Sequence, residues 1–229
     1  MDDYSALLGI LDLSFHHPKL LRQAFTHRSY LNESKQNLQS NERLEFLGDA
    51  ILSFVMSAYL FKLKPDDEEG DLTNLRSYIV KTKSLAEAAD KLHLGEYLLL
   101  SKGEDATGGR NNPQLMANTY ESVIGAIFLD QGLEAATKTF TQTLLPLFQK
   151  ELANGPPKDS KSELQEVVQE RAKESPQYKI LGTHGPDHAK QFTVGVFIKN
   201  KQLGQGVGNS KQEAEETAAK QALEKLTQL

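Results

Sequence analysis

The sequence predicts two domains of different fold class: an all-helical domain over residues 1–152 and a small α+β domain over residues 161–229. Three observations lead to this prediction. Apolar residues recur with helical period through nearly all of the first part. The segment ANGPPKDSK combines glycine, two prolines and polar residues, so we expect a linker at residues 153–160. After it, β-branched and aromatic residues gather in short runs that indicate strands.

The helical domain is expected to contain five regions of helical period. They cover residues 19–30, 42–63, 72–92, 112–129 and 133–152.

The second domain is expected to follow the order α-β-β-β-α. KSELQEVVQERAKE has helical spacing, and QYKILGTH, QFTVGVFIK and the glycine-rich KQLGQGVG indicate three strands. SKQEAEETAAKQALEKL indicates a final helix, with Ser210 as its N-cap. The alanines of this helix, at positions 214, 218, 219 and 222, are expected to pack closely against the sheet.

Composition indicates a soluble globular protein. The chain has 229 residues, of which 38% are hydrophobic and 25% charged, and its longest apolar runs, such as YLLL, are short for a bilayer. The acidic start MDDYSALLGI lacks the basic region of a signal peptide. The chain has no cysteine, which excludes disulfides, thiolate zinc sites and a cysteine nucleophile. We expect a cytoplasmic protein with no membrane partner.

The net charge of −5 taken alone argues against nucleic-acid binding. The acidic excess is uneven, however. Residues 158–229 carry 11 Lys and Arg against 10 Asp and Glu, whereas residues 1–157 carry 15 against 21. A basic face on the second domain is therefore compatible with the composition.

The segment NERLEFLGDAIL, at residues 41–52, carries three acids among apolar residues. On a helix, Glu42, Glu45 and Asp49 fall within an arc of roughly 60°. The opposite side is expected to face the core through Leu44, Leu47, Ile51 and Phe54. A stripe of like charges repels itself unless a cation lies there. A solvated helix face is the alternative interpretation.

A second acidic site lies in LMANTYESVIGAIFLDQG. Asn118 and Glu121 are three residues apart on an expected helix and share a face. Oxygen ligands on two helices suit Mg²⁺ or Mn²⁺, and such a site can support phosphodiester hydrolysis. Asp66, Asp67, Glu68 and Glu69 also precede a helix, where acids stabilise the helix dipole without any further function.

NERLEFLGDAIL resembles the signature motif of the ribonuclease III family. Other segments fall in the order of that family: FTHRSY, EEGDLTNLRS, GGRNN and ANTYESVIGAIFLDQG. GQGVGNSKQEAEETAAKQAL resembles the end of a double-stranded-RNA-binding domain, so the resemblance covers nearly the whole chain.

The resemblance implies a ribonuclease III endonuclease domain, all-α, followed by a double-stranded-RNA-binding domain. It implies a divalent-metal-dependent endoribonuclease, using Mg²⁺ with Mn²⁺ as a substitute, that acts as a symmetric homodimer. The products would carry a 5′ phosphate and a 3′ hydroxyl. Members of the family process ribosomal RNA precursors and some messenger RNAs.

Matching positions carry the family's cleavage residues onto this chain. Glu45, Asn118 and Glu121 match metal ligands, and Asp49 and Glu121 match catalytic residues. The family most often has Asp at the position of Asn118. A carboxamide oxygen can still bind Mg²⁺ but brings no charge, so the resemblance implies weaker metal affinity.

Three further positions match family residues around the cleavage centre. Glu42 and Glu69 match acids that support cleavage or handle RNA. Phe46 matches an aromatic residue that packs across the dimer interface, with ordinary core packing as the alternative.

The resemblance assigns RNA contacts to Gln165 and Gln169 on the first helix of the second domain. It adds His188 in the loop HGPDH, and Lys211 at the start of the last helix, aimed at phosphates. The family usually has more basic residues there, whereas Gln212 and an acid follow Lys211, so we expect modest affinity. Ordinary surface glutamines remain the alternative for positions 165 and 169.

Two other functions compete with this interpretation. A protein that binds duplex RNA without cutting it would be expected to lack one of the three acids Glu45, Asp49 and Glu121, and all three are present. A helical dimerisation scaffold would leave the appended α-β-β-β-α domain unexplained.

Overall fold

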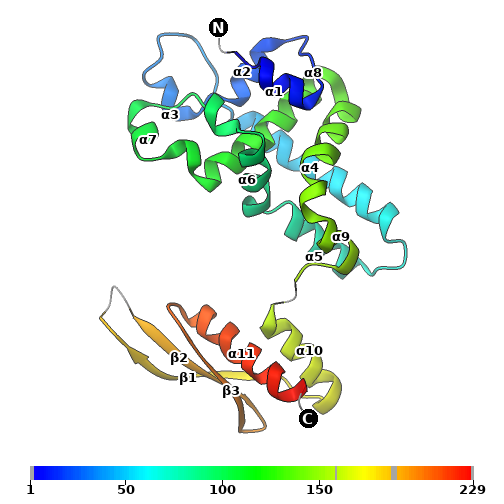
Figure 1. Ribbon diagram of the computed structural model, residues 1–229, viewed down its shortest axis with the longest axis vertical. Coiled ribbons are helices and arrows are strands. Elements are labelled where there is room, and N and C mark those ends of the chain that lie inside the picture. Colours follow the sequence, from blue (N-terminus) through cyan, green and yellow to red (C-terminus); the bar gives the residue numbers. More distant parts are fainter. Residues whose placement is uncertain (1–2, 158, 187–189, 228–229) are drawn as a thin grey trace. The chain divides into compact units, whose positions relative to one another are not determined.

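The computed structural model describes residues 3–157, 159–186 and 190–227 (Figure 1). It consists of two compact units, Met1–Pro156 and Pro157–Leu229, and each has its own hydrophobic core. The first is helical, and the second combines helices with a three-stranded sheet, which confirms the predicted fold class.

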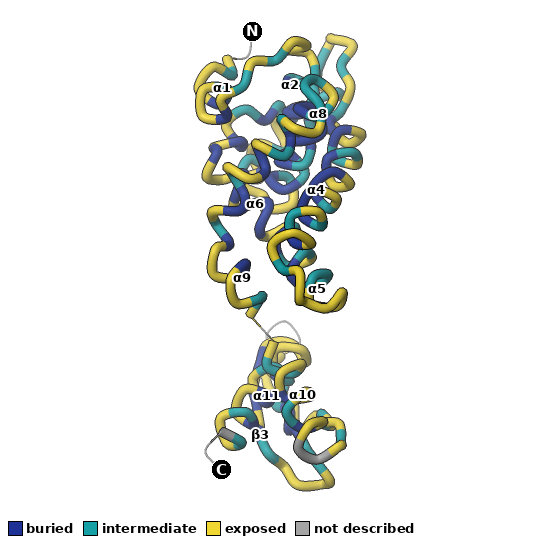
Figure 2. Tube along the Cα trace, turned by 90° about the vertical axis from the view of Figure 1, so that its right-hand side faces the viewer, coloured by how far each residue is buried: buried dark blue, intermediate teal, exposed yellow. Residues whose placement is uncertain are grey.

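The helical unit is built around two long helices, α4 (Glu42–Leu63) and α8 (Pro113–Thr143). Figure 2 shows that buried and exposed positions alternate along each of these two helices. The other helical elements are α1 (Ser5–Leu11), α2 (Pro18–Ala24), α3 (Arg28–Leu31), α5 (Glu69–Ile79), α6 (Thr82–Lys91), η1 (Leu94–Tyr97), α7 (Lys102–Ala106), η2 (Gly109–Asn111), η3 (Leu145–Phe148) and α9 (Gln149–Asn154).

Two glycines allow α4 and α8 to touch through their backbones. Gly48 on α4 faces the backbone of Glu121, and Gly125 on α8 faces the backbone of Leu44. A methyl group at either glycine would overlap the carbonyl oxygen of the facing helix. The absence of a side chain at both positions therefore sets how closely the two helices approach.

The single helix predicted over residues 19–30 is wrong. The chain leaves α2 at Phe25, and Thr26 forms an isolated parallel bridge with Leu99. The backbone N–H of His27 donates to Leu99 O at 3.1 Å, and the N–H of Leu99 donates to Phe25 O at 2.8 Å. Hydrogen bonds to a segment distant in sequence replace helical ones here.

The regions predicted at residues 72–92 and 133–152 are also interrupted. The first consists of two helices, α5 and α6, separated by Val80 and Lys81. The second begins inside α8, which continues through a kink at Gly132 (φ 83°) before η3 and α9 follow. Helices α1 and α7 lie outside the predicted regions.

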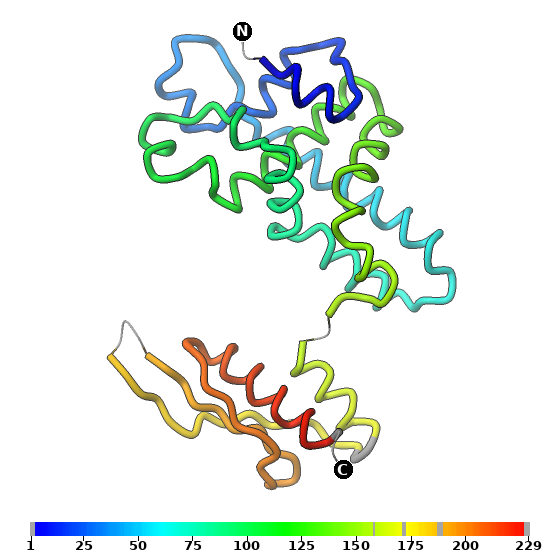
Figure 3. The backbone as a smooth tube through the Cα atoms, viewed as in Figure 1, coloured from blue at the N-terminus to red at the C-terminus, as the bar shows by residue number. Residues whose placement is uncertain are grey.

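The second unit has the predicted α-β-β-β-α order. Its three strands are antiparallel in the order β1-β2-β3, and α11 packs against β2 and β3 on one face of the sheet (Figures 1 and 3). The elements are α10 (Ser160–Ala172), β1 (Gln177–His184), β2 (Gln191–Ile198), β3 (Lys201–Gly208) and α11 (Lys211–Thr227).

Small residues on both sides bring β3 and α11 together. A methyl group at any of the three glycines of β3 would overlap the α11 backbone. The alanines that face them are fully buried, which confirms the predicted close packing. The residues are Gly204, Gly206, Gly208, Ala214, Ala218 and Ala222.

Ser210 caps the start of α11. The hydroxyl of Ser210 accepts from the backbone N–H of Glu213 at 3.1 Å, which confirms the predicted N-cap and satisfies one of the donors that a helix start leaves unpaired. Glu213 Oε2 accepts from the backbone N–H of Asn209 at 2.7 Å and so holds the residue before the cap.

By length and composition alone, α4, at 22 residues, is the one helix among the described residues that could cross a membrane. The core helix of a soluble protein meets the same criterion. Leu44, Ile51, Leu52, Val55, Met56 and Leu60 of α4 lie in the hydrophobic core.

We expect Gly48→Ala to lower the free energy of unfolding by about 1–3 kcal/mol, because the new methyl group forces two packed backbones apart. Urea unfolding followed by circular dichroism measures this. Gly9→Ala in α1 is the matched control, since nothing lies within 4 Å of a methyl group there. Equal stability of Gly48→Ala and the unmodified chain would contradict the close crossing.

Candidate cleavage centre

Three carboxyl groups lie near one another where α4 and α8 cross. Glu45 and Asp49 flank Gly48 on α4, and Gly48 lies against the backbone of Glu121 on α8. Burial raises the pKa of Glu121 to about 8, and the charges of Asp49 and Glu45 contribute to the rise. The three groups therefore repel one another within one partly buried site.

Glu45, on α4, also has a raised pKa. It is half-buried, and burial raises its pKa, followed by the charge of Glu42. A hydrogen bond from the side chain of Asn118 acts in the opposite direction. Glu42 and Asp49 are exposed. The acidic stripe is therefore more than a solvated helix face, since its middle member turns toward α8.

Asn118 is half-buried and held by a neighbour on its own helix. Gln114 Nε2 donates to Asn118 Oδ1 at 2.7 Å. The acceptor end of the Asn118 carboxamide thus points one turn back along α8, and its donor end serves Glu45. Gln114 was not among the predicted site residues, although its position four residues before Asn118 on a helix indicates the contact.

A cavity of about 280 Å³ opens beside Glu45 and Asn118, whereas Asp49 and Glu121 do not line it. Four segments of the chain line it: the start of α3, the start of α4, Leu98 directly after η1, and the first turns of α8. Its polar lining consists of His27, Arg28, Asn41, Glu42, Glu45, Asn118 and Thr119.

The rim of the cavity pairs a cation with an acid. Arg28 Nη1 lies 3.6 Å from Glu42 Oε1, and the hydroxyl of Ser40 donates to Glu42 Oε2 at 2.9 Å. His27 Nδ1 lies 2.8 Å from the hydroxyl oxygen of Ser29, and burial lowers the pKa of His27. Arg28 was not among the predicted site residues.

Glu69 does not join this group within one chain. It is exposed at the start of α5, and its Oε1 accepts from the hydroxyl of Thr73 at 2.9 Å. It neither lines the cavity nor contributes to the shifts at Glu45 and Glu121.

The donor set fits a hard divalent cation. Carboxylate and carboxamide oxygens are the donors that Mg²⁺ prefers, and burial followed by the charges of neighbouring acids raises the pKa values of Glu45 and Glu121. Within the described residues no group of three or more His, Asp or Glu is close enough to hold a metal ion by itself. The protein would therefore supply few ligands and water the remainder, as is common for Mg²⁺.

Helix α4 has a second apolar face. Phe46 is 81% exposed, Phe54 58% and Phe61 75%. Core packing of Phe46 is therefore excluded within the described chain, and the prediction that Phe54 faces the core is wrong. Phe54 lies outside the side of α4 that α8 covers.

The predicted RNA contacts lie on the second unit. Gln165 and Gln169 are exposed one turn apart on α10, and Lys211 is exposed at the start of α11. His188 lies outside the described residues. The side chains of Gln165 and Gln169 therefore do not pack in the core.

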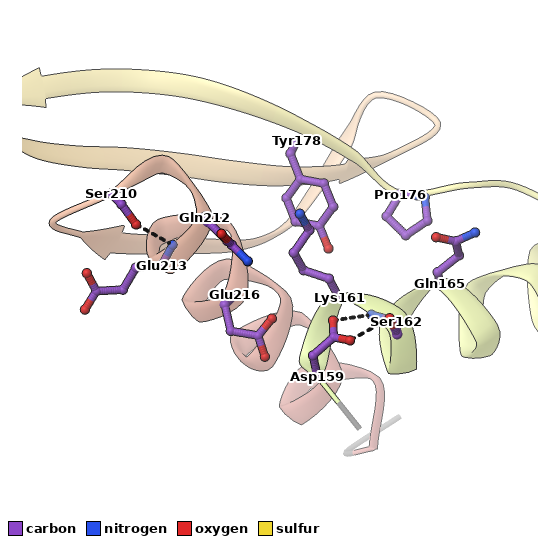
Figure 4. Close-up of a pocket in the computed structure, with 10 residues that line it drawn as sticks. All are labelled: Asp159, Lys161, Ser162, Gln165, Pro176, Tyr178, Ser210, Gln212, Glu213 and Glu216. Atoms are coloured by element: carbon purple, nitrogen blue, oxygen red, sulfur yellow. Dashed lines mark hydrogen bonds between the residues drawn. The ribbon is translucent and has the colours of Figure 1, made fainter. Parts of the chain in front are cut away.

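Acids surround the starts of α10 and α11. A groove of about 680 Å³ there is lined by residues that include Asp159, Lys161, Gln165, Tyr178, Glu213 and Glu216 (Figure 4). Lys161 forms an ion pair with Glu215. Burial raises the pKa of Tyr178 to about 12, and Glu215 is the next largest cause. Negative charge beside Lys211 weakens this end as a phosphate-binding surface.

The chain is similar to known proteins over nearly its whole length. Residues 17–147 match the family model described as Ribonuclease-III-like, and residues 160–226 match the double-stranded RNA binding motif. The chain is 46% identical over 225 residues to Ribonuclease 3 of Pelotomaculum thermopropionicum, covering 98% of this chain and 93% of that protein. It is 48% identical over 216 residues to Ribonuclease 3 of Anoxybacillus flavithermus, covering 94% and 90%.

A solved structure agrees with the helical unit. The nuclease domain of ribonuclease III from Campylobacter jejuni is 37% identical with a TM-score of 0.60, covering 64% of this chain and 99% of that domain. That domain has a flexible region involved in dimer formation.

The raised pKa of Glu121 predicts a pH dependence of stability in EDTA. Between pH 4.5 and about 8 the folded state retains a proton that the unfolded state has lost. The free energy of unfolding should therefore fall as pH rises through this range. Glu121→Gln should flatten the fall in urea titrations at pH 5 and 8, and Glu134→Gln, exposed on the same helix, should not. Identical slopes for all three chains would contradict the clustered carboxyl groups.

Proposed function

Because the chain belongs to the ribonuclease III family of endoribonucleases that act on double-stranded RNA, we propose that it hydrolyses RNA duplexes with Mg²⁺, for which Mn²⁺ can substitute. Water adds across the bond between phosphorus and the 3′ oxygen, leaving a 5′ phosphate and a 3′ hydroxyl. The observation that supports the metal dependence is the group of acids at the crossing, where burial, followed by the charges of Asp49 and Glu45, raises the pKa of Glu121 to about 8.

We assign the cation to Glu45, Asn118 and Glu121, and the catalytic roles to Asp49 and Glu121. A divalent cation there supplies polarisation of a phosphodiester oxygen. Glu121 is the most strongly shifted acid of the site, so it is the group most responsive to a bound cation. Asp49 is exposed and can accept a proton from solvent water.

Glu42 and Glu69 are assigned to supporting roles in RNA handling. Glu42 stands at the cavity rim, where an incoming strand would meet it. Glu69 stands outside the cavity, so its contribution would come through the bound duplex.

We propose a homodimer formed through the exposed aromatic face of α4. Phe46, Phe54 and Phe61 are apolar, largely exposed and on one side of the helix. Contiguous apolar surface of this kind typically marks an interaction site. Likeness to the family supports a second copy of the chain as the partner.

The second unit is proposed to hold the duplex. Gln165 and Gln169 would enter a minor groove of A-form RNA, His188 the next one, and Lys211 would contact phosphates. With acids beside Lys211, affinity per unit is modest and the dimer gains by avidity. Likeness to the family supports ribosomal RNA precursors and some messenger RNAs as substrates in the cytoplasm.

Glu121→Ala should abolish cleavage of a long RNA duplex in Mg²⁺ while leaving duplex binding in place, because the binding unit is separate. A gel assay reads cleavage and a mobility shift reads binding. Glu134→Ala, further along α8, is the control and should cut normally. Normal cutting by Glu121→Ala would refute the assignment of the site.

Asn118→Asp should lower the Mg²⁺ concentration needed for half-maximal cleavage. The Asn118 oxygen now accepts from Gln114, so the carboxamide must turn over to present oxygen beside Glu45. A carboxylate needs no such turn and adds a charge. An unchanged Mg²⁺ titration would show that position 118 does not ligate the cation.

A further inference from the structure

The cavity beside the crossing contains one permanently charged cationic side chain among its described lining residues, that of Arg28. The acids at the same cavity are Glu42 and Glu45. His27 also lines it, but burial lowers the pKa of His27 and so favours a neutral ring. Arg28 would therefore supply the fixed positive charge for a polyanion that enters this cavity.

Hydrogen bonds hold the backbone around Arg28, whereas its side chain extends into solvent. The N–H of His27 donates to Leu99 O at 3.1 Å, and the N–H of Tyr30 donates to His27 O at 3.0 Å. The side chain of Arg28 is 72% exposed. The guanidinium thus extends from an anchored position at the rim.

The present partner of Arg28 holds it weakly. Its distance of 3.6 Å to Glu42 exceeds the roughly 2.7–2.9 Å of a good charge-assisted hydrogen bond. The Glu42 side chain is 55% exposed and also accepts from Ser40. Exposed ion pairs contribute little to stability, so Arg28 can exchange Glu42 for another anion at small cost.

An RNA strand supplies such an anion. A phosphodiester placed for hydrolysis at the crossing has neighbouring phosphates on the same strand, and these need positive charge that the acids cannot provide. A guanidinium suits phosphate because its planar fork can donate two hydrogen bonds to the phosphate oxygens.

We propose that Arg28 binds a phosphate of the RNA strand adjacent to the phosphodiester that is cleaved, exchanging its contact with Glu42 for that phosphate. The inference rests on the proposed function, because it places the cleaved strand in this cavity. The exchange would also leave Glu42 free to interact with the RNA. Arg28 is then a substrate-binding residue of the cleavage reaction.

Steady-state cleavage of an RNA duplex in Mg²⁺ over a series of KCl concentrations tests the proposal with the full chain. Arg28→Gln should raise KM about tenfold, because one hydrogen bond to a charged group is lost, and should change kcat less than about twofold. The slope of log kcat/KM against log KCl should become shallower by about 0.9, as for one lost phosphate contact. Arg28→Lys should restore the slope and recover part of KM.

Lys138→Gln is the matched control, because Lys138 is an exposed cation on the same unit that pairs with Asp12 at 2.7 Å. It should change neither KM nor the salt slope. Unchanged KM and slope in Arg28→Gln, or a lower kcat with KM unaltered, would overturn the phosphate contact. Failure of the unmodified chain to cut in Mg²⁺ or Mn²⁺ would instead refute the proposed function and, with it, this contact.

Discussion

The site depends on the contact between two helix backbones. Gly48 on α4 and Gly125 on α8 leave no side chain between the helices, so the carbonyl groups of Glu121 and Leu44 lie directly against the opposite helix. The side chains of Glu45, three positions before Gly48, and Asp49, one position after it, then lie close enough to Glu121 to raise its pKa. A larger residue at the crossing would separate the carboxyl groups and weaken the core together, so stability and chemistry share one constraint.

Close approach has an electrostatic cost. Glu45, Asp49 and Glu121 gather in partly buried surroundings, and the pKa of Glu121 rises to about 8. A bound cation would offset this repulsion, which explains why an otherwise stable helix pair carries three acids at its contact. Asn118 reduces the charge at the same place and donates to Glu45 through its amide. Gln114 donates a hydrogen bond to the Asn118 carboxamide, and Arg28 lies 3.6 Å from Glu42 at the rim of the cavity.

The sequence predicted both fold classes, the bounds of α4 and the order of the second unit, because periodicity and turn residues act locally. It placed Glu45, Asp49, Asn118 and Glu121 on two helices, but only the fold shows that these helices meet. The break at Phe25 comes from pairing with Leu99, far along the chain. Phe54 was wrongly predicted to face the core, because helical angles identify an apolar side of a helix without showing which part of that side another element covers. Gln114 was missed although its spacing of four residues from Asn118 on a helix indicates the contact. Arg28 was missed because its contact with Glu42 depends on how the chain folds between α3 and α4.

The most direct measurement is a gel assay of the purified protein on a long RNA duplex in EDTA, Mg²⁺ or Mn²⁺, with analysis of the product ends. The account predicts no cutting in EDTA and conversion to short duplexes with 5′ phosphates when either cation is added. Cutting that persists undiminished in EDTA, or binding without cutting in both cations, would contradict a cation-dependent cleavage centre at the crossing of α4 and α8.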